Sequence, residues 1–175
     1  MEMFDKIFQT AAANVPPEYF RLLVAQAPEI YRERAYCYEL YHQMRSLWLP
    51  ANQTDYRLCG EVDKRGHPYF AGDKGASNPD FIVHIPGTDD NYAVIEVKTR
   101  TGLSDRGGLE KDIETLLRFV GDCHYRRAIH LVFGASARAT VEALHGIGID
   151  AGTLGAIEFW GHEAPGAPAV KRTLD

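Results

Sequence analysis

Two acidic residues and a lysine stand at the ends of two short apolar runs near the middle of the chain. Asp80 directly precedes the run 81–85, and Glu96 follows the run 92–95 and is itself followed, two positions later, by Lys98. Two neighbouring carboxylates can share one divalent cation, and Mg²⁺ prefers oxygen ligands, keeps several waters and completes its shell with a substrate phosphate. The cation and the lysine would keep both carboxylates ionised, although the pair alone repels. These residues are therefore a candidate metal site.

The local pattern predicts that the three side chains meet. Both apolar runs are rich in residues that favour strands, and the segment between them contains proline, glycine and two aspartates, which favour a hairpin turn. Pairing of Ile85 with Asn91 would set the antiparallel register. Asp80 then lies opposite Glu96, with Cβ atoms about 4.5–5.5 Å apart. Because side chains alternate along a strand, Glu96 and Lys98 leave the same face of the sheet.

The Pro-Asp pair at 79–80 and the Glu-Val-Lys tripeptide at 96–98 resemble the motif of the PD-(D/E)xK nucleases, a superfamily with the restriction-endonuclease-like fold. The resemblance implies that Asp80 and Glu96 would hold Mg²⁺, for which Mn²⁺ would substitute, and that the backbone carbonyl of Val97 would also ligate the metal. Lys98 would position the attacking water or help to deprotonate it. The superfamily often adds an acidic residue from a helix before the first strand, and Glu39 is the nearest match.

This resemblance implies a Mg²⁺-dependent nuclease that hydrolyses phosphodiester bonds in nucleic acid, DNA more than RNA, in restriction, repair or phage defence. The alternative is a catalytically silent module of the same fold that binds DNA or assembles with a partner. Small size and negative charge favour a homodimer or a partner protein. The sequence leaves open endonuclease or exonuclease action, the preferred nucleic acid and the number of metal ions.

A helix is predicted before these strands, from 28 to about 49. Its apolar residues recur at helical spacing and form a stripe, which consists of Cys37, Leu40, Tyr41, Met44, Leu47 and Trp48. Glu39 lies off this stripe and points away from the strand carboxylates if the stripe faces the sheet. It faces the site if the stripe packs on an N-terminal helix instead. We expect the second arrangement, because Ala35 and His42 beside Glu39 leave room for a cleft.

The remaining pattern predicts an α/β fold, with a central mixed sheet flanked by helices in an α-β-β-β-α-β core. An amphipathic helix between two strands implies a parallel pair with a right-handed connection, and its stripe consists of Leu109, Ile113, Leu116, Leu117 and Val120. The other expected elements are a short helix opened by Pro16 and Pro17 that covers 18–24, a first strand at 56–63, a strand at 128–133, a helix around 138–144 and a strand at 156–160.

Length and composition indicate a single domain, 1–175, with N-terminal helices at 1–50, a sheet core at 51–160 and an extended tail at 161–175. The chain has neither an apolar run long enough to span a membrane nor the N-terminal pattern of a signal peptide, so we expect a cytoplasmic protein without membrane contact. The cysteines Cys37, Cys59 and Cys123 are odd in number and lack close spacing, which indicates buried thiols rather than disulfides.

The chain has a net charge of −5 and therefore lacks the overall basic character that is typical of nucleic-acid-binding domains. A local basic surface remains open, and its candidate members are Arg32, Arg34, Arg45, Arg100, Arg106, Lys111, Arg118, Arg126 and Arg127. Glu61 is a second choice of metal ligand, although a solvent-facing role is commoner. His42 and His84 could line the cleft or serve in packing. Cys123, His124 and His130 form no closed tetrahedral set, so zinc is not expected.

Overall fold

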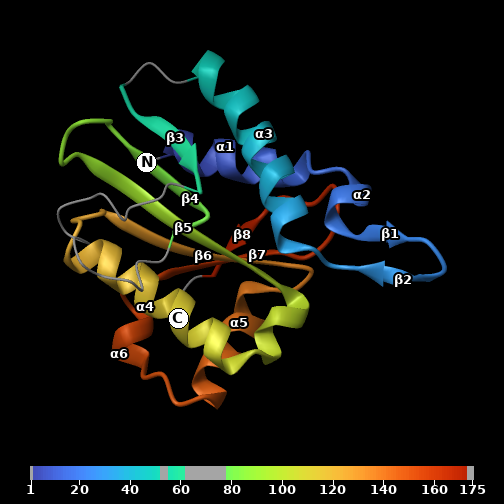
Figure 1. Cartoon of the computed structure of the whole chain (residues 1–175). Helices are drawn as coiled ribbons and strands as arrows, with labels where there is room; N and C mark the ends of the chain where they lie inside the picture. Colours follow the sequence, from blue (N-terminus) through green and yellow to red (C-terminus); the bar gives the residue numbers. More distant parts are fainter. Residues whose placement is uncertain (1, 52–54, 62–77, 173–175) are drawn as a thin grey trace.

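A six-stranded sheet forms the centre of the computed structural model, which describes residues 2–51, 55–61 and 78–172 (Figure 1). Its strands lie side by side in chain order and are β3 (Arg57–Gly60), β4 (Phe81–His84), β5 (Asn91–Thr99), β6 (Arg127–Phe133), β7 (Glu158–His162) and β8 (Val170–Lys171). The sheet is mixed. β5, β6 and β7 run parallel, whereas β3, β4 and β8 pair antiparallel with their neighbours.

Crossover helices explain the parallel strands. α4 (Arg106–Gly121) connects β5 to β6, and α5 (Ala137–Gly146) with the short α6 (Ala151–Leu154) connects β6 to β7. The amphipathic spacing in α4 predicted the first connection, and the predicted strand, helix and strand after it are also present. The α/β architecture with a mixed sheet between helices is therefore confirmed, although neither α6 nor the N-terminal helix at Glu2–Ala13 was predicted.

Helices cover both faces of the sheet and create two apolar cores (Figure 1). On one face, α1 (Glu2–Ala13) and α3 (Glu33–Ala51) bury Phe8 and Leu40 in one cluster with Val97 and Trp160 of the sheet. On the other face, α4 and α5 pack over the residues of the sheet that point the opposite way. Within the described part of the chain, no helix has the length and apolar character that a membrane span requires.

The N-terminal region differs from the prediction. The helix after the prolines, α2 (Pro17–Phe20), ends early, and β1 (Leu22–Val24) and β2 (Ala27–Ile30) form a separate hairpin where helix was expected. Ala27–Ile30 form β2 instead of the first turn of the expected helix, so α3 begins only at Glu33. α3 also continues through Pro50 to Ala51, beyond the predicted end.

The C-terminal region is more structured than a tail. β7 extends to His162, and the segment after it returns along the sheet so that β8 pairs with β7, Trp160 lying opposite Lys171. At the other edge, β3 occupies only part of the predicted strand 56–63, whose last two residues lie outside the described residues.

A buried aromatic cluster joins α3 to the sheet. The rings of Tyr36 and Phe133 stack with centroids 4.0 Å apart, and the Tyr36 hydroxyl lies 2.7 Å from Nδ1 of His162. Both hydrogen-bonding residues are fully buried, so this contact joins two polar groups that have left water. Burial lowers the pKa of His162 to about 4 from an ordinary value of 6.5.

The first prediction concerns acid stability. Below pH 6.5 the unfolded chain binds a proton at His162 that the folded protein takes up only near pH 4. The free energy of unfolding should therefore fall as pH decreases through this window, and His162→Phe should weaken that dependence. Urea unfolding of both proteins between pH 7 and 4.5 measures how the free energy of unfolding depends on pH. His145→Phe, at an exposed histidine of α5, is the control, and a pH dependence unchanged in His162→Phe would contradict the assignment.

Candidate active site

The β4–β5 hairpin brings Asp80 next to Glu96. Phe81 pairs with Ile95, and the next positions along the two strands are Asp80 and Glu96, as the spacing predicted. The predicted pair at the turn was wrong, because His84 rather than Ile85 lies opposite Asn91, and a register shift beside Val83 absorbs the difference. At the site end, the Val97 N–H donates a hydrogen bond of 2.7 Å to Asp80 Oδ2. The Asp80 carboxylate is thus fixed against β5.

Lys98 lies between two acidic residues from different helices. Its Nζ is 2.9 Å from Oδ2 of Asp112 on α4 and 3.8 Å from Oε2 of Glu33 on α3. Burial alone would lower the pKa of Lys98, but Asp112, together with Glu33 and Glu96, outweighs it, so the net shift is upward and the side chain stays an ammonium. These ion pairs tie β5 to helices on both faces of the sheet.

Glu33, rather than Glu39, is the α3 carboxylate at this cluster. The apolar stripe of α3 faces the sheet, and Glu33 lies on that stripe, four residues before the buried Cys37. Glu39 lies off the stripe, and its Oε1 accepts a hydrogen bond of 2.6 Å from Gln43 Nε2 on the same helix. No contact of Glu39 with Asp80 or Lys98 occurs among the described residues. Position on the stripe was the sequence signal that could have identified Glu33.

The two central carboxylates resist ionisation. Burial raises the pKa of Asp80 to about 7, and the charges of Glu33 and Asp112 add to this, while the hydrogen bond from Val97 opposes it. Burial also raises the pKa of Glu96 well above its ordinary value, and the charge of Asp80 acts in the same direction. Glu96 is only 7% exposed, and its Oε1 has no hydrogen-bond partner in the described part of the chain. A cation near this oxygen would satisfy it and stabilise both charges.

Asp112 and His130 complete the cluster and were missed as site residues. His130 pairs with Glu96 across β5 and β6, is fully buried, and has its Nε2 3.6 Å from Asp112 Oδ2. Neither ring nitrogen has a hydrogen bond within the described residues. The signal for Asp112 was a carboxylate at a stripe position of α4, three residues after Leu109.

The other candidates from the sequence have separate surroundings. Glu61 is exposed, its N–H donates to the Asp80 carbonyl at 3.0 Å, and its Oε1 is 3.6 Å from Arg34 Nε. His42 is exposed on α3, and His84 Nε2 lies 3.7 Å from Cys59 Sγ. The three cysteines are free thiols, as expected, and Cys59 is the one that is not fully buried.

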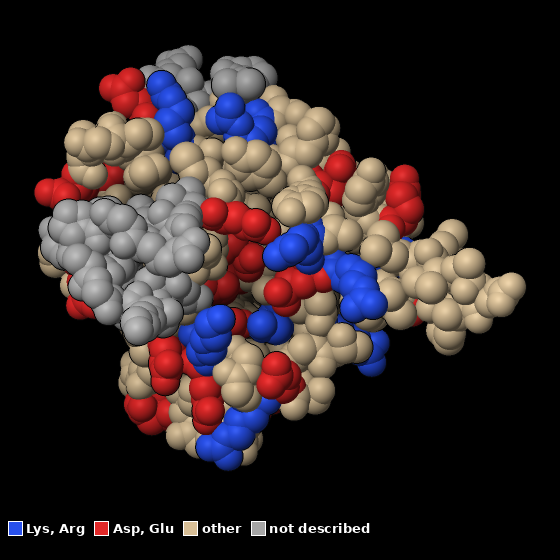
Figure 2. Space-filling view, viewed as in Figure 1, with Lys and Arg blue, Asp and Glu red and all other residues tan. Residues whose placement is uncertain are grey.

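Charge is arranged unevenly over this face of the molecule. Figure 2 shows acidic side chains gathered in a central hollow, with Lys and Arg side chains around its rim. Several arginines expected to form a basic surface are held in ion pairs, namely Arg34 with Glu61, Arg106 with Glu110, Arg118 with Asp122 and Arg126 with Asp90. The described residues contain no group of three His, Cys, Asp or Glu side chains placed to hold a metal ion unaided. Mg²⁺ commonly needs only one or two carboxylates, with water and phosphate as further ligands.

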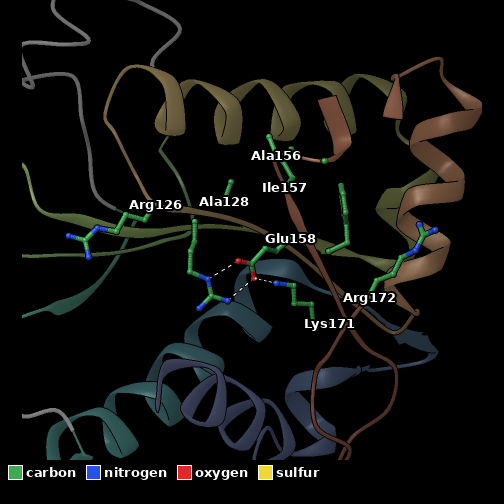
Figure 3. A pocket seen from close by; sticks show the side chains of 10 residues that line it. Arg126, Ala128, Ala156, Ile157, Glu158, Lys171 and Arg172 are labelled. Atoms are coloured by element: carbon green, nitrogen blue, oxygen red, sulfur yellow. Dashed lines mark hydrogen bonds and ion pairs between the residues drawn. The ribbon is translucent and has the colours of Figure 1, made fainter. Parts of the chain in front are cut away.

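A cavity of about 410 Å³ lies at the N-terminal ends of β6 and β7, away from the Asp80 and Glu96 cluster (Figure 3). Its charges largely satisfy one another. Glu158 accepts hydrogen bonds of 2.8 and 2.6 Å from Arg127, and its Oε2 is 3.2 Å from Lys171 Nζ. Figure 3 shows the side chains of Arg126 and Arg172 directed away from Glu158 on different sides. The charged residues that line this cavity therefore form ion pairs with one another, and we do not treat them as a set of reactive groups.

Comparison of the chain with protein-family models, with curated proteins and with solved structures found no match. The chemistry of the cluster around Asp80 and Glu96 is therefore the basis for assigning a function.

The second prediction tests the electrostatic strain at Asp80. The folded protein binds a proton at Asp80 up to about pH 7, whereas the unfolded chain releases it near pH 3.8. Stability contributed by protonated Asp80 is therefore lost as pH rises through this window. Asp80→Asn keeps an acceptor for the Val97 N–H and removes the charge. In chelator it should raise the melting temperature at pH 8 by about 2–4 °C, the effect of roughly 1 kcal/mol in a chain of this length.

Thermal unfolding at pH 8 and pH 5 measures this effect, which should shrink at the lower pH. Asp89→Asn, at an exposed aspartate in the turn of the same hairpin, is the matched control and should change neither value. Equal destabilisation of Asp80→Asn at both pH values would show that the carboxylate is not under strain.

Proposed function

We propose that this protein is a Mg²⁺-dependent nuclease of the PD-(D/E)xK type. The observation that carries the proposal is the adjacent pair Asp80 and Glu96, with the Lys98 ammonium on the same strand face and with a buried Glu96 oxygen that has no hydrogen-bond partner among the described residues. The element order α3, β3, β4, β5, α4, β6 supports a restriction-endonuclease-like fold, because it follows the α-β-β-β-α-β order expected from the motif.

Each residue has a role that its surroundings support. Asp80 and Glu96 would hold the metal, and the Val97 carbonyl would contribute by analogy with the superfamily. Glu33 replaces Glu39 as the acidic residue from the helix, because it is the one paired with Lys98. A bound Mg²⁺ would lower the pKa of a coordinated water and offset charge on the scissile phosphate.

Lys98 would orient the attacking water and offset charge that develops on a phosphate oxygen. Asp112 fixes its ammonium from the α4 side at 2.9 Å, so the lysine is already positioned before substrate arrives. The acidic hollow would repel a phosphate, so nucleic acid should bind well only with the divalent cation present. DNA is the substrate favoured by the resemblance, with RNA as the alternative to test.

The third prediction is loss of cleavage in the site variants. Asp80→Ala and Glu96→Ala should each reduce cleavage by about 100-fold or more, because metal-assisted catalysis is lost. Lys98→Ala should cause a similar loss in turnover with little change in metal affinity. The assay uses linear, circular and single-stranded DNA and RNA, each with Mg²⁺, Mn²⁺ or chelator.

Glu110→Ala, on the outer side of α4, is the control and should cleave as wild type does. Mg²⁺ should also raise the melting temperature of the wild type and not of Asp80→Ala. Wild-type protein that binds DNA but cleaves none of these substrates would favour the catalytically silent alternative. Activity of Asp80→Ala within about threefold of wild type would exclude the metal assignment, since that is only about 0.7 kcal/mol in barrier height.

The fourth prediction distinguishes the two glutamates of α3. Glu33→Gln should slow cleavage by about tenfold or more at saturating Mg²⁺, because Glu33 lies at the cluster and pairs with Lys98. Glu39→Gln should leave the rate within twofold and stability within about 0.5 kcal/mol, as for an ordinary surface change. Rates and unfolding curves are measured on both variants side by side. A larger loss of cleavage rate in Glu39→Gln than in Glu33→Gln would identify Glu39 as the acidic site residue of α3.

A further inference from the structure

A cavity of about 290 Å³ opens beside Asp80, between α3 and the start of β4. It is lined by Tyr38 and Tyr41 of α3, by Gly60 and Glu61 at the end of β3, and by Asp80 and Phe81. α3 passes beside β3 and β4 on this side of the sheet (Figure 1). The volume of the cavity is close to the lower limit for small-molecule sites in proteins. The metal chemistry proposed above uses only the Asp80 side of this space.

The two tyrosines give this cavity one packed aromatic wall and one that is exposed to solvent. The Tyr41 ring lies almost parallel to Phe81, with centroids 6.1 Å apart, and its hydroxyl donates to the Leu58 carbonyl at 3.4 Å. Tyr38 is 58% exposed, which leaves its ring accessible from solvent. An accessible aromatic ring beside a charged site is a suitable platform for stacking a flat ring.

The polar groups of the cavity select against anions. Among the described residues that line it, Glu61 and Asp80 are acidic, and their oxygens accept hydrogen bonds and, when ionised, repel negative charge. A neutral ring that carries N–H donors fits these acceptors, and the exocyclic amino groups of cytosine and adenine are such donors. Arg34, 75% exposed and 3.6 Å from Glu61, lies near enough for its guanidinium to contact a phosphate attached to such a ring.

We propose that this cavity binds one unpaired nucleobase next to the scissile phosphate, so that the substrate is single-stranded or locally unpaired nucleic acid. The identification of the substrate as nucleic acid rests on the proposed nuclease function. A base inside an intact duplex is stacked on both sides, and its extrusion costs free energy that a single strand does not require. Binding in the cavity would therefore favour unpaired substrate over duplex.

Neutral nucleosides test the cavity without metal or cleavage. The fluorescent nucleoside 2-aminopurine riboside should bind in chelator with quenching of its emission, and cytidine and adenosine should displace it better than thymidine. Tyr38→Ala should weaken binding at least tenfold, the scale of one lost stacking contact. Tyr38→Phe should restore it, because the ring is retained. Tyr19→Ala, at a tyrosine that is 40% exposed and does not line the cavity, should bind as wild type does.

Cleavage kinetics test whether the cavity serves the substrate. Wild type should cleave single-stranded DNA with a KM at least tenfold below that for duplex of the same sequence. Tyr38→Ala should raise the KM for the single strand about tenfold while kcat stays within twofold, because the lost contact is made equally in the bound substrate and the transition state. Glu61→Gln should reduce the preference for cytidine over thymidine in the nucleoside assay.

The outcomes separate the two proposals. Nucleoside binding that depends on Tyr38, without cleavage of any nucleic acid, would retain the base site and overturn the nuclease assignment. Cleavage that prefers duplex and is unaffected by Tyr38→Ala would retain the nuclease and overturn the base site. Absence of both would overturn both.

Discussion

The antiparallel register between β4 and β5 is the constraint on which the candidate site depends. Side chains alternate along a strand, so a slip of one residue would move Glu96 and Lys98 to the α1 and α3 face and separate them from Asp112 and His130. The register is held from both sides. Apolar residues of β4 and β5 fill a separate core on each face, and seven residue pairs with β6 fix the other edge of β5. The hydrogen bond from the Val97 N–H to Asp80 then depends on this register being correct. The stability of the sheet therefore maintains a chemical arrangement that is unfavourable by itself.

That arrangement concentrates negative charge in a small volume. The carboxylates of Glu33, Asp80, Glu96 and Asp112 influence one another, and Lys98 forms ion pairs with Glu33 and Asp112. Removal of one carboxylate relieves repulsion but also weakens the positioning of Lys98, so these residues act as a unit rather than as independent contributors. The two apolar cores and the ring stack of Tyr36 on Phe133 supply the rigidity that holds such a group together without a bound cation. Local strain at a site that is supported elsewhere in the fold is a common sign of function.

Local patterns predicted the parts of the fold that depend on neighbours in sequence. The alternation in the hairpin and the helical spacing in α4 were sufficient to predict the opposition of Asp80 and Glu96 and the crossover to β6. The stripe of α3 also showed that Glu39 points away from the site if the stripe faces the sheet, and the choice of Glu39 was wrong because the alternative packing was preferred. Local patterns could not identify Asp112 and His130 as site residues. Their proximity to Glu96 depends on how α4 packs and on the parallel pairing of β5 with β6. The β1–β2 hairpin was not predicted, because proline is compatible both with the first turn of a helix and with an edge strand, and the sequence pattern favoured the helix.

The cluster draws its members from α3, the β4–β5 hairpin, α4 and β6, and so from positions between Glu33 and His130. The hairpin that carries the motif is local in sequence and can form early, whereas the contacts that complete the cluster join distant segments and form only after loop closure. During synthesis on the ribosome, a nascent chain that has emerged only as far as Lys98 carries the whole motif without Asp112 and His130 beside it. The cluster is complete only when β6 pairs with β5. The order of the elements along the chain therefore makes assembly of the cluster a late event in the folding of this sheet.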